Sequence, residues 1–341
     1  MAEFSLTAVP MCWAVDIIPV LQHVPDGFPG TGFKNTARQW RKFIEASACV
    51  PYKLVRRQMA ADIHRPSYVS KLVEKLSQDG NGELSVDDEE WAIWTVASLY
   101  GAVAETTVIT LTAFTLAMIK FPEVQRKAQE EIERVVGTDR LPSFHDREKL
   151  PYVDAMVKEA IRWWPIVPMG FSHTATEEFP YKGYHIPKCA YLLPAVWWFL
   201  HGPSVYPEPE CFDPERFLPP RNEPDPGVEA CGYGRRICQG RFFADYGLYL
   251  NIVQSLSVFN RGKAVDEKGK EIEVDVRPKP GILTYPSEFK SRVNVRSEKL
   301  AELIRRSDHR NSKEEIDTLL VESMATLFGP CDNARVQVPA H

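Results

Sequence analysis

The sequence has little of what marks a disulfide-stapled, zinc-binding or nucleic-acid-binding protein. Its seven cysteines are odd in number and widely scattered, without a C-x-x-C pair. Neither a disulfide framework nor a zinc site is therefore expected, and a reducing compartment is the better prediction. The net charge of -5 comes from both signs and gives no broad basic field, so no nucleic-acid partner is implied. The cysteines are Cys12, Cys49, Cys189, Cys211, Cys231, Cys238 and Cys331.

A secretory leader is not expected from the first twenty residues. Their short apolar stretches are broken by Glu3, Asp16 and prolines, without a basic start or a continuous apolar core. One longer segment, Trp91 to Phe121, has about the length needed to cross a bilayer, but Glu105 at its middle would be costly in lipid. A buried core helix is favoured, and an integral membrane protein built on this segment is the weakest alternative.

Helical signals dominate a chain of 341 residues, which is long enough for one large or two ordinary domains. A long helix is predicted from the acidic N-cap region at Asp87 and Asp88 to near Pro122. A second helix runs from Pro122 to Gly137, where glycine favours termination. Two more are predicted from apolar spacing, over Tyr152–Trp164 and from about Phe242 to Leu256. The fold class is therefore mostly α.

A small β region is expected between Pro180 and Pro194 and again near the end of the chain. Tyr184–Ile186 and Tyr191–Leu193 are short β-like runs broken by glycine and proline. Lys270–Val276 and Gly281–Tyr285 are predicted to form the two strands of a hairpin.

One glycine-punctuated loop, Gly232 to Gly240, reads GYGRRICQG and holds Cys238 immediately before a helical pattern. Glycines permit the positive-φ backbone that aims N–H groups at sulfur, and a following helix N-terminus favours a thiolate. A thiolate presented this way can bind heme iron. Alone, Cys238 would be read as a buried free cysteine. Two further motifs, Glu159–Arg162 upstream and Pro214–Phe217 between, decide against that reading by their order and spacing.

Together these motifs resemble the cytochrome P450 family, whose heme loop reads F-x-x-G-x-R-x-C-x-G. The resemblance implies Cys238 as the proximal ligand of heme b, iron protoporphyrin IX. It covers about residues 10 to 306 and matches the C-terminal part of a fungal membrane-bound member, roughly two-thirds of that fold. Residues 1–306 are assigned to this domain, and residues 307–341 to a C-terminal extension. For a full-length form, the family implies the cytoplasmic face of the endoplasmic reticulum membrane.

The Glu159 and Arg162 side chains are three residues apart on one helix face and are able to pair. By resemblance the pair also meets Arg216 and forms a buried network that supports the heme loop. Without the cysteine loop, an exposed ion pair of little energetic value would be the preferred interpretation.

Acid and alcohol groups stand together at Glu105 and Thr106, midway along the long predicted helix. Splitting an O–O bond requires two protons, which such groups can deliver. The alternative is a threonine bonded to its own helix carbonyl and a glutamate reaching solvent. By resemblance these two residues match the acid–alcohol pair of the family. Val103 departs from the pattern, since glycine is common there.

Further contacts to heme follow from the same resemblance. Arg236 matches the position that binds a heme propionate, for which a guanidinium fork is suited, and His173 aligns with a second propionate contact. The loop glycines that shape the cofactor site are Gly232, Gly234 and Gly240. Two departures are Cys231, where phenylalanine usually covers the sulfur, and Gln239, where proline is frequent.

An apolar substrate pocket is also implied, although plain core packing explains each of its residues as well. Its members are Gly101, Ala102, Ile166, Val167, Met169, Gly170 and Ile282.

The resemblance implies a heme-thiolate monooxygenase that inserts one atom of O2 into a small apolar organic substrate. Electrons would come from NADPH through a reductase. The alternative is a catalytically inactive, truncated family member that serves as a heme-binding or interaction protein.

Overall fold

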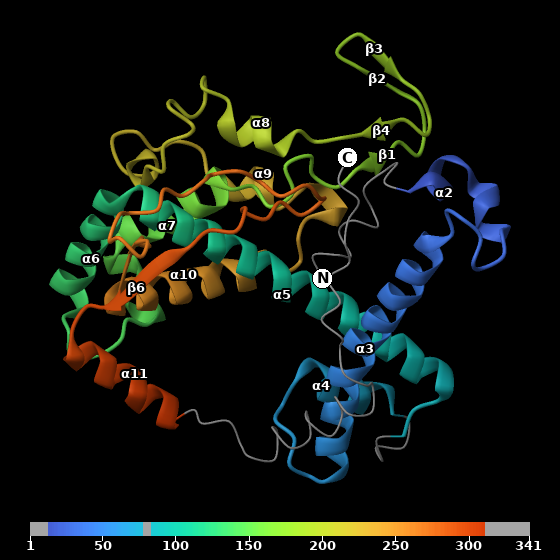
Figure 1. Ribbon diagram of the computed structural model, residues 1–341, viewed down its shortest axis with the longest axis horizontal. Helices are drawn as coiled ribbons and strands as arrows, with labels where there is room; N and C mark the ends of the chain where they lie inside the picture. Colours follow the sequence, from blue (N-terminus) through green and yellow to red (C-terminus); the bar gives the residue numbers. More distant parts are fainter. Residues whose placement is uncertain (1–12, 78–82, 311–341) are drawn as a thin grey trace. The chain divides into compact units, whose positions relative to one another are not determined.

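The computed structural model describes residues 13–77 and 83–310, which are mostly α-helical with three short two-stranded β-ladders (Figure 1). The chain divides into two compact units, one formed by residues 1–102 with 311–341 and the other by residues 103–310. The expectations for Cys12, Cys331 and residues 311–341 fall outside the described residues. Helix α11 (Glu298–Arg310) runs through the expected domain boundary at 306/307, and that boundary stays a prediction.

The first unit is helical in its described part. It contains α2 (Ala14–Ile17), the 3-10 turn η1 (Pro19–His23), α3 (Gly32–Ala60), α4 (Tyr68–Leu76) and the start of α5 (Val86–Lys120). Because apolar residues recur on facing sides of α3, α4 and α5, these helices bury one cluster. The cluster consists of Tyr52, Val69, Val73, Ala92 and Val96.

Helix α5 begins one residue before the predicted acidic pair. The Ser85 hydroxyl accepts a hydrogen bond from the Asp88 N–H at 3.2 Å, which caps the helix, and donates one to the Asp88 carboxylate at 2.7 Å. By length and composition alone, α5 could cross a membrane. However, Ile109, Phe114 and Met118 are fully buried in the core of the second unit, so this half of α5 is a core helix.

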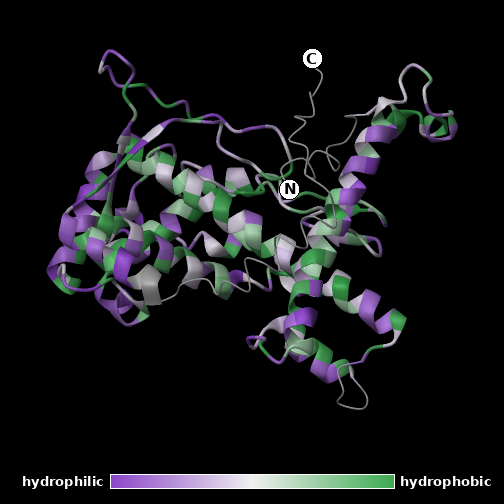
Figure 2. Ribbon diagram, turned by 60° about the horizontal axis from the view of Figure 1, so that its bottom comes forward, coloured by the Kyte–Doolittle hydropathy of each residue, from purple (hydrophilic) through white to green (hydrophobic). Residues whose placement is uncertain are grey.

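The second unit is organised around four helices. The C-terminal half of α5 packs with α6 (Pro122–Val136), α7 (Pro151–Trp163) and α10 (Arg241–Val258) in one buried apolar cluster. The sequence prediction of these helices is confirmed, including the end of α6 at Gly137, whose φ is 77°. Helices α6 and α7 are amphipathic, and the ribbon in Figure 2 carries both hydrophobic and hydrophilic residues. Shorter elements are η2 (Phe144–Lys149), α8 (Val196–His201), η3 (Pro214–Phe217), α9 (Gly227–Ala230) and η4 (Gly234–Arg236).

The β region consists of separate antiparallel pairs. Strand β1 (His173–Thr174) pairs with β4 (Tyr191–Leu192), and β2 (Phe179–Tyr181) pairs with β3 (Tyr184–Ile186). The strands predicted at Tyr184–Ile186 and around Tyr191 are therefore confirmed, but they belong to two ladders. Strands β5 (Phe259–Lys263) and β6 (Ser291–Val295), which were not predicted, form the third.

The predicted hairpin of Lys270–Val276 with Gly281–Tyr285 is wrong. Neither segment forms a strand, and only isolated bridges link Val265 to Glu271 and Pro278 to Pro286. Prolines 278, 280 and 286 have no N–H to donate to a ladder. The apolar alternation has another cause, because these segments lie extended against the helical core. The side chains that pack there are Val274, Val276, Leu283 and Tyr285.

Candidate functional site

The cysteine loop joins α9 to α10 and is shaped by two glycines. Gly232 and Gly234 have φ values of 74° and 57°, which side-chain-bearing residues rarely adopt. The Cys238 N–H donates a 2.7 Å hydrogen bond back to the Cys231 carbonyl, which closes the loop. Cys238 therefore lies in a tight turn three residues before the first residue of α10.

The Cys238 side chain is exposed, and its thiol is free. Gly240 leaves room beside it, because a Cβ at this position would lie 4.0 Å from the Cys238 sulfur. The Arg241 guanidinium donates to the Cys238 carbonyl at 3.1 Å and so holds the backbone of the turn. Cys231, where the family usually has phenylalanine, is half-buried. Burial raises the pKa of the Cys231 thiol, and the nearby Cys238 raises it further.

The groups around the exposed thiol fit a heme. Arg236 is exposed, and its side chain has no hydrogen bond or ion pair recorded within residues 13–77 and 83–310. It is therefore available for a carboxylate such as a propionate. Phe242 and Phe243, on the first turn of α10, are 63% and 66% exposed. A soft sulfur donor, an available guanidinium and uncovered aromatic rings are the chemistry that an apolar, dianionic iron porphyrin requires.

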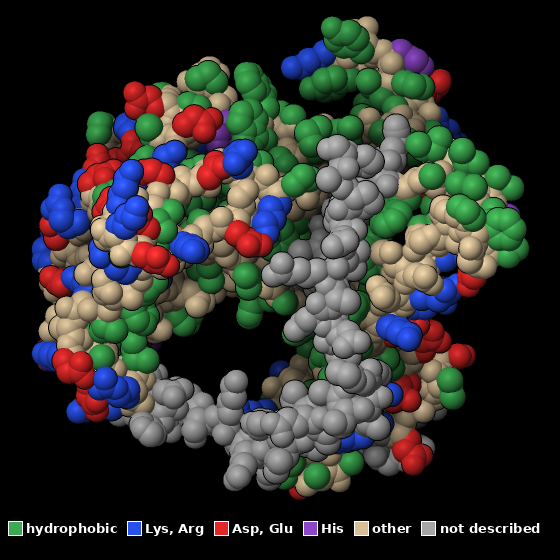
Figure 3. All heavy atoms as spheres, in the orientation of Figure 1, with side chains coloured by type: hydrophobic (Ala, Val, Ile, Leu, Met, Phe, Trp, Pro, Cys, Tyr) green, Lys and Arg blue, Asp and Glu red, His purple; other side chains and the backbone are tan. Residues whose placement is uncertain are grey.

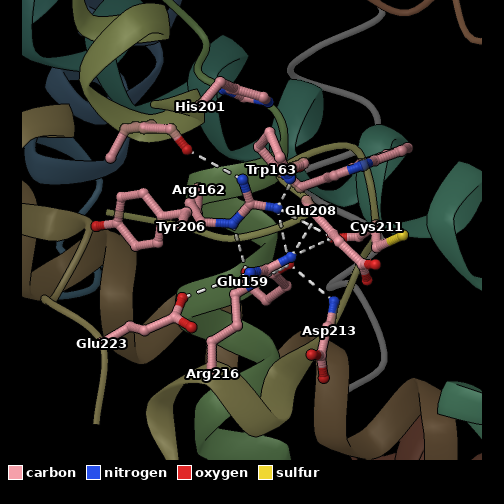
Figure 4. Close-up of polar contacts among 12 residues, drawn as sticks. Glu159, Arg162, Trp163, His201, Tyr206, Glu208, Cys211, Asp213, Arg216 and Glu223 are labelled. Atoms are coloured by element: carbon pink, nitrogen blue, oxygen red, sulfur yellow. Dashed lines mark hydrogen bonds and ion pairs between the residues drawn. The ribbon is translucent and has the colours of Figure 1, made fainter. Parts of the chain in front are cut away.

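The charged network predicted around Glu159 is present and fully buried (Figure 4). Both Glu159 oxygens accept from Arg162, at 2.7 Å from Nε and 2.8 Å from Nη2. Arg216 Nε donates to the same carboxylate at 3.3 Å, and the Asp213 N–H donates at 2.8 Å. Burial raises the pKa of Glu159, while the bonds from Arg162, Asp213 and Arg216 oppose that rise. The structure thus brings together α7 and η3.

The two arginines also hold a long loop in place through its carbonyl groups. Arg162 donates to the carbonyls of Leu200, Pro209 and Cys211 at 3.0, 2.8 and 3.1 Å. Arg216 donates to the carbonyls of Glu208 and Cys211 at 2.6 and 3.2 Å, and to that of Pro207. The network thus fixes the backbone between Leu200 and Cys211 against α7 and η3, and its support of the cysteine loop stays a prediction.

Many other charged side chains lie at the surface, where the two signs are interspersed, as the face in Figure 3 shows, although Glu131 and Asp146 are buried. Arg126 pairs with Glu130 at 2.6 Å, and the two side chains are 69% and 60% exposed. Pairs of this kind contribute little to stability. They provide a matched comparison for the buried network.

His201 is a buried part of this region that the sequence did not reveal. Its ring stacks on the Trp197 ring, with centroids 4.6 Å apart and planes 6° apart, and its Nδ1 lies 3.1 Å from the Trp197 carbonyl oxygen. Burial, together with the charge of Arg162, lowers the pKa of His201 to about 4. The imidazole is therefore neutral in the folded protein at neutral pH.

We expect this histidine to make the protein less stable in mild acid. In the unfolded chain His201 binds its proton near pH 6.5, but in the folded chain only near pH 4, so the stability it gives is complete above pH 6.5 and is lost as the pH falls between these values. Between pH 7 and pH 5 the free energy of unfolding should fall by about 1–2 kcal/mol. Urea unfolding at the two pH values measures this fall. The His201→Phe variant keeps the stacked ring and should lose that part of the pH dependence; an unchanged pH dependence would contradict the assignment.

Glu105 and Thr106 lie on α5, where both are half-buried. The hydroxyl of Tyr285 donates a hydrogen bond to the Glu105 carboxylate, so Glu105 does not simply reach solvent. Burial raises the pKa of Glu105. The carbonyl of Thr106 accepts a 3.3 Å hydrogen bond from the Thr110 hydroxyl. Val103, which departs from the family pattern, is 36% exposed.

The expected substrate-contact residues lie in two segments that the structure joins. The Thr284 N–H donates to the Ile166 carbonyl at 2.8 Å, and Trp164 Nε1 donates to the Thr284 carbonyl at 2.7 Å. Ile282 is therefore next to the segment that follows α7. Met169 is 55% exposed, and Gly170 has a φ of 56° and a backbone so close to Pro194 that a Cβ would clash.

The remaining predicted residues are more scattered. Val167 is half-buried beside Ile166, and Gly101 and Ala102 lie on α5 at the end of the first unit. His173, expected to contact a propionate, is half-buried in β1, opposite Leu192 of β4.

Comparisons with known proteins cover most of the chain, the cysteine loop included. The cytochrome P450 family model matches residues 4–293. A multifunctional cytochrome P450 monooxygenase of Aspergillus fumigatus is 48% identical over 309 residues, which is 90% of this chain and 58% of that protein. A cytochrome P450 monooxygenase of Gibberella zeae is 45% identical over 327 residues, covering 95% of this chain and 62% of its own length.

A relative with a more specific name is the O-methylsterigmatocystin oxidoreductase of Aspergillus flavus. It is 39% identical over 312 residues, which is 90% of this chain and 57% of the relative. The chain thus spans about three-fifths of the length of the curated relatives it matches.

Proposed function

Because this chain belongs to the cytochrome P450 family, we propose that it acts as a heme-thiolate monooxygenase. The reaction would insert one atom of O2 into a small apolar organic substrate, with electrons from NADPH through a reductase. The observation that carries the proposal is the exposed Cys238 thiol, held in a turn by two positive-φ glycines directly before α10.

Three groups of residues would hold heme b. Cys238 would supply the thiolate ligand, Arg236 a propionate contact and His173 a second one. Gly232, Gly234 and Gly240 would keep the loop backbone close to the macrocycle; a side chain would be strained at Gly232 and Gly234, whose φ values are positive, and at Gly240 it would contact the Cys238 sulfur. When bound through a thiolate, heme supplies the reductive activation of O2 that oxygen insertion needs.

The chain's own contribution to turnover would be proton handling on α5. Glu105 would exchange protons through its carboxylate, and burial raises the pKa of that group. Thr106, the next residue, would pass protons through its hydroxyl. The surrounding apolar wall of α5, including the buried Ile109, would limit the access of bulk water.

We expect Thr106→Ala to leave heme bound but to misdirect proton delivery. Without the hydroxyl, NADPH consumption should yield hydrogen peroxide in place of organic product, and the coupled fraction should fall about tenfold or more, the usual range for loss of a proton donor. Peroxide and NADPH are measured together in a reductase-reconstituted assay. Thr112→Ala is the matched control, because its hydroxyl donates to the Val108 carbonyl on an exposed face of the same helix. Equal coupling in the two variants would count against Thr106.

The substrate would contact the segments around Ile166 and Ile282, with Val167, Met169, Gly170, Gly101 and Ala102 as further candidates. A small apolar molecule is the class that such side chains accept. The reductase would meet the protein at the cytoplasmic face of the endoplasmic reticulum, as the family implies.

The direct test supplies the heme-loaded chain with NADPH, a fungal reductase and isotopically labelled O2, with naphthalene as the probe substrate. NADPH-dependent O2 uptake and one labelled oxygen atom in the product would support the proposal. A heme-thiolate protein that takes up no O2 with NADPH would instead be a heme-binding protein without turnover.

A further inference from the structure

The Tyr285 side chain contacts Glu105 across 180 residues of sequence. Tyr285 lies in the extended segment after residue 276, and Glu105 lies on α5. Both belong to the second unit. No motif in the sequence pairs them, and nothing in the proposed proton path requires a tyrosine.

Tyr285 is held firmly enough to fix its partner. Its carbonyl accepts a 2.7 Å hydrogen bond from the Lys279 N–H, and the neighbouring Thr284 is tied on both sides, to the Ile166 carbonyl and to the Trp164 indole. The Tyr285 ring packs against the apolar core cluster that includes Ile109, one turn beyond Glu105 on α5. The hydroxyl therefore has a defined position.

Without such a partner, the Glu105 side chain would not be held in one position. A free glutamate on a helix surface samples many rotamers, and ordering it costs conformational entropy. A phenol stays protonated at neutral pH, so it is always a donor to a carboxylate, and such charge-assisted bonds are stronger than neutral ones. The Tyr285 hydroxyl supplies this ordering from outside the helix.

We propose that Tyr285 is a positioning residue: it holds the Glu105 carboxylate in one place and thereby couples the Ile282 segment to the proton-handling residues of α5. This proposal rests on the proposed function. Because Ile282 is three residues before Tyr285, a ligand that displaces the Ile282 segment also displaces the donor that fixes Glu105.

A double-mutant cycle on the full chain tests the contact without any turnover. Tyr285→Phe removes only the hydroxyl, while Glu105→Gln keeps the shape and a carbonyl acceptor but removes the charge, so the cycle measures the charge-dependent part of the bond. The effects of the two changes on the unfolding equilibrium constant should be non-additive by about fivefold, because a hydrogen bond to a charged group is roughly twice as strong as one to a neutral group. The control cycle crosses Glu105→Gln with Tyr191→Phe, a tyrosine that is 77% exposed, and should be additive. Additivity in the Tyr285 cycle as well would overturn the proposal.

Infrared difference spectra give a second readout. The carboxyl bands assigned to Glu105 by the Glu105→Gln variant should shift in Tyr285→Phe and stay unchanged in Tyr191→Phe. Bands that do not shift in Tyr285→Phe would also overturn the proposal.

Turnover measurements distinguish a failure of this proposal from a failure of the proposed function. In the NADPH assay, Tyr285→Phe should lower the coupled fraction as Glu105→Gln does, and the double variant should be no worse than either. If the cycle shows coupling but Tyr285→Phe turns over like the wild type, the positioning role is wrong. If the wild-type chain shows no NADPH-dependent O2 uptake, the proposed function fails, and with it the catalytic purpose of the positioning, even where the cycle and the spectra establish the contact.

Discussion

Replacing Arg162 by alanine should lower the free energy of unfolding by about 3–5 kcal/mol, because it leaves a buried carboxylate without its main partner. Arg162 and Glu159 have no exposed side-chain surface, and they share two hydrogen bonds of 2.7 and 2.8 Å. The change also removes the Arg162 donor from the carbonyls of Leu200, Pro209 and Cys211, of which Cys211 keeps its bond from Arg216. A loss of this size is a large part of the stability of an ordinary domain.

Urea unfolding followed by circular dichroism measures the loss. The matched control is Arg126→Ala, whose exposed pair with Glu130 should contribute less than about 1 kcal/mol. Arg162→Lys keeps the charge but not the planar fork, and its stability should fall between the other two. If Arg162→Ala and Arg126→Ala lose the same amount, the network does not support the fold in the way described.

Replacing Cys238 by alanine should remove the protein's own ligand to heme iron and weaken heme binding by at least about tenfold. Changes to groups that merely orient a metal ligand already cost about 10–100-fold in affinity, and no neighbouring side chain offers an equal replacement. Cys231 is the nearest thiol along the loop, but it is half-buried and burial raises its pKa.

Heme titration followed by absorbance compares the variants. Cys211→Ala is the matched control, because Cys211 is a free, exposed cysteine whose carbonyl, not its sulfur, takes part in the buried network. Its affinity for heme should equal that of the wild type. Equal weakening in both variants would show that neither sulfur is specifically required.

The sequence predicted the local parts of this structure better than the distant ones. Spacing along one helix was enough to pair Glu159 with Arg162, and the long core helices followed from apolar periodicity. That Arg216 joins this pair was inferred only from the resemblance to the family. The loop carbonyls that surround both arginines could not be predicted, because every residue carries a backbone carbonyl and the sequence does not show which of them accept a hydrogen bond.

The features that the sequence predicted wrongly or did not predict depend on contacts between residues far apart in the chain. The hairpin expected at Lys270–Val276 and Gly281–Tyr285 had alternating apolar residues, but alternation also suits an extended segment lying on a helical core. Tyr285 and Glu105 are 180 residues apart, and nothing local links them. No sequence pattern singled out His201, and only the fold shows that it is buried against Trp197.

The most direct test of a heme-thiolate site at Cys238 is the carbon-monoxide difference spectrum of the reduced, heme-loaded chain. A thiolate on ferrous heme shifts the Soret band strongly to the red, and the wild type and Cys211→Ala should both show this band. Cys238→Ala should lack it. A wild-type spectrum without the red-shifted band, or a band that survives in Cys238→Ala, would contradict the account.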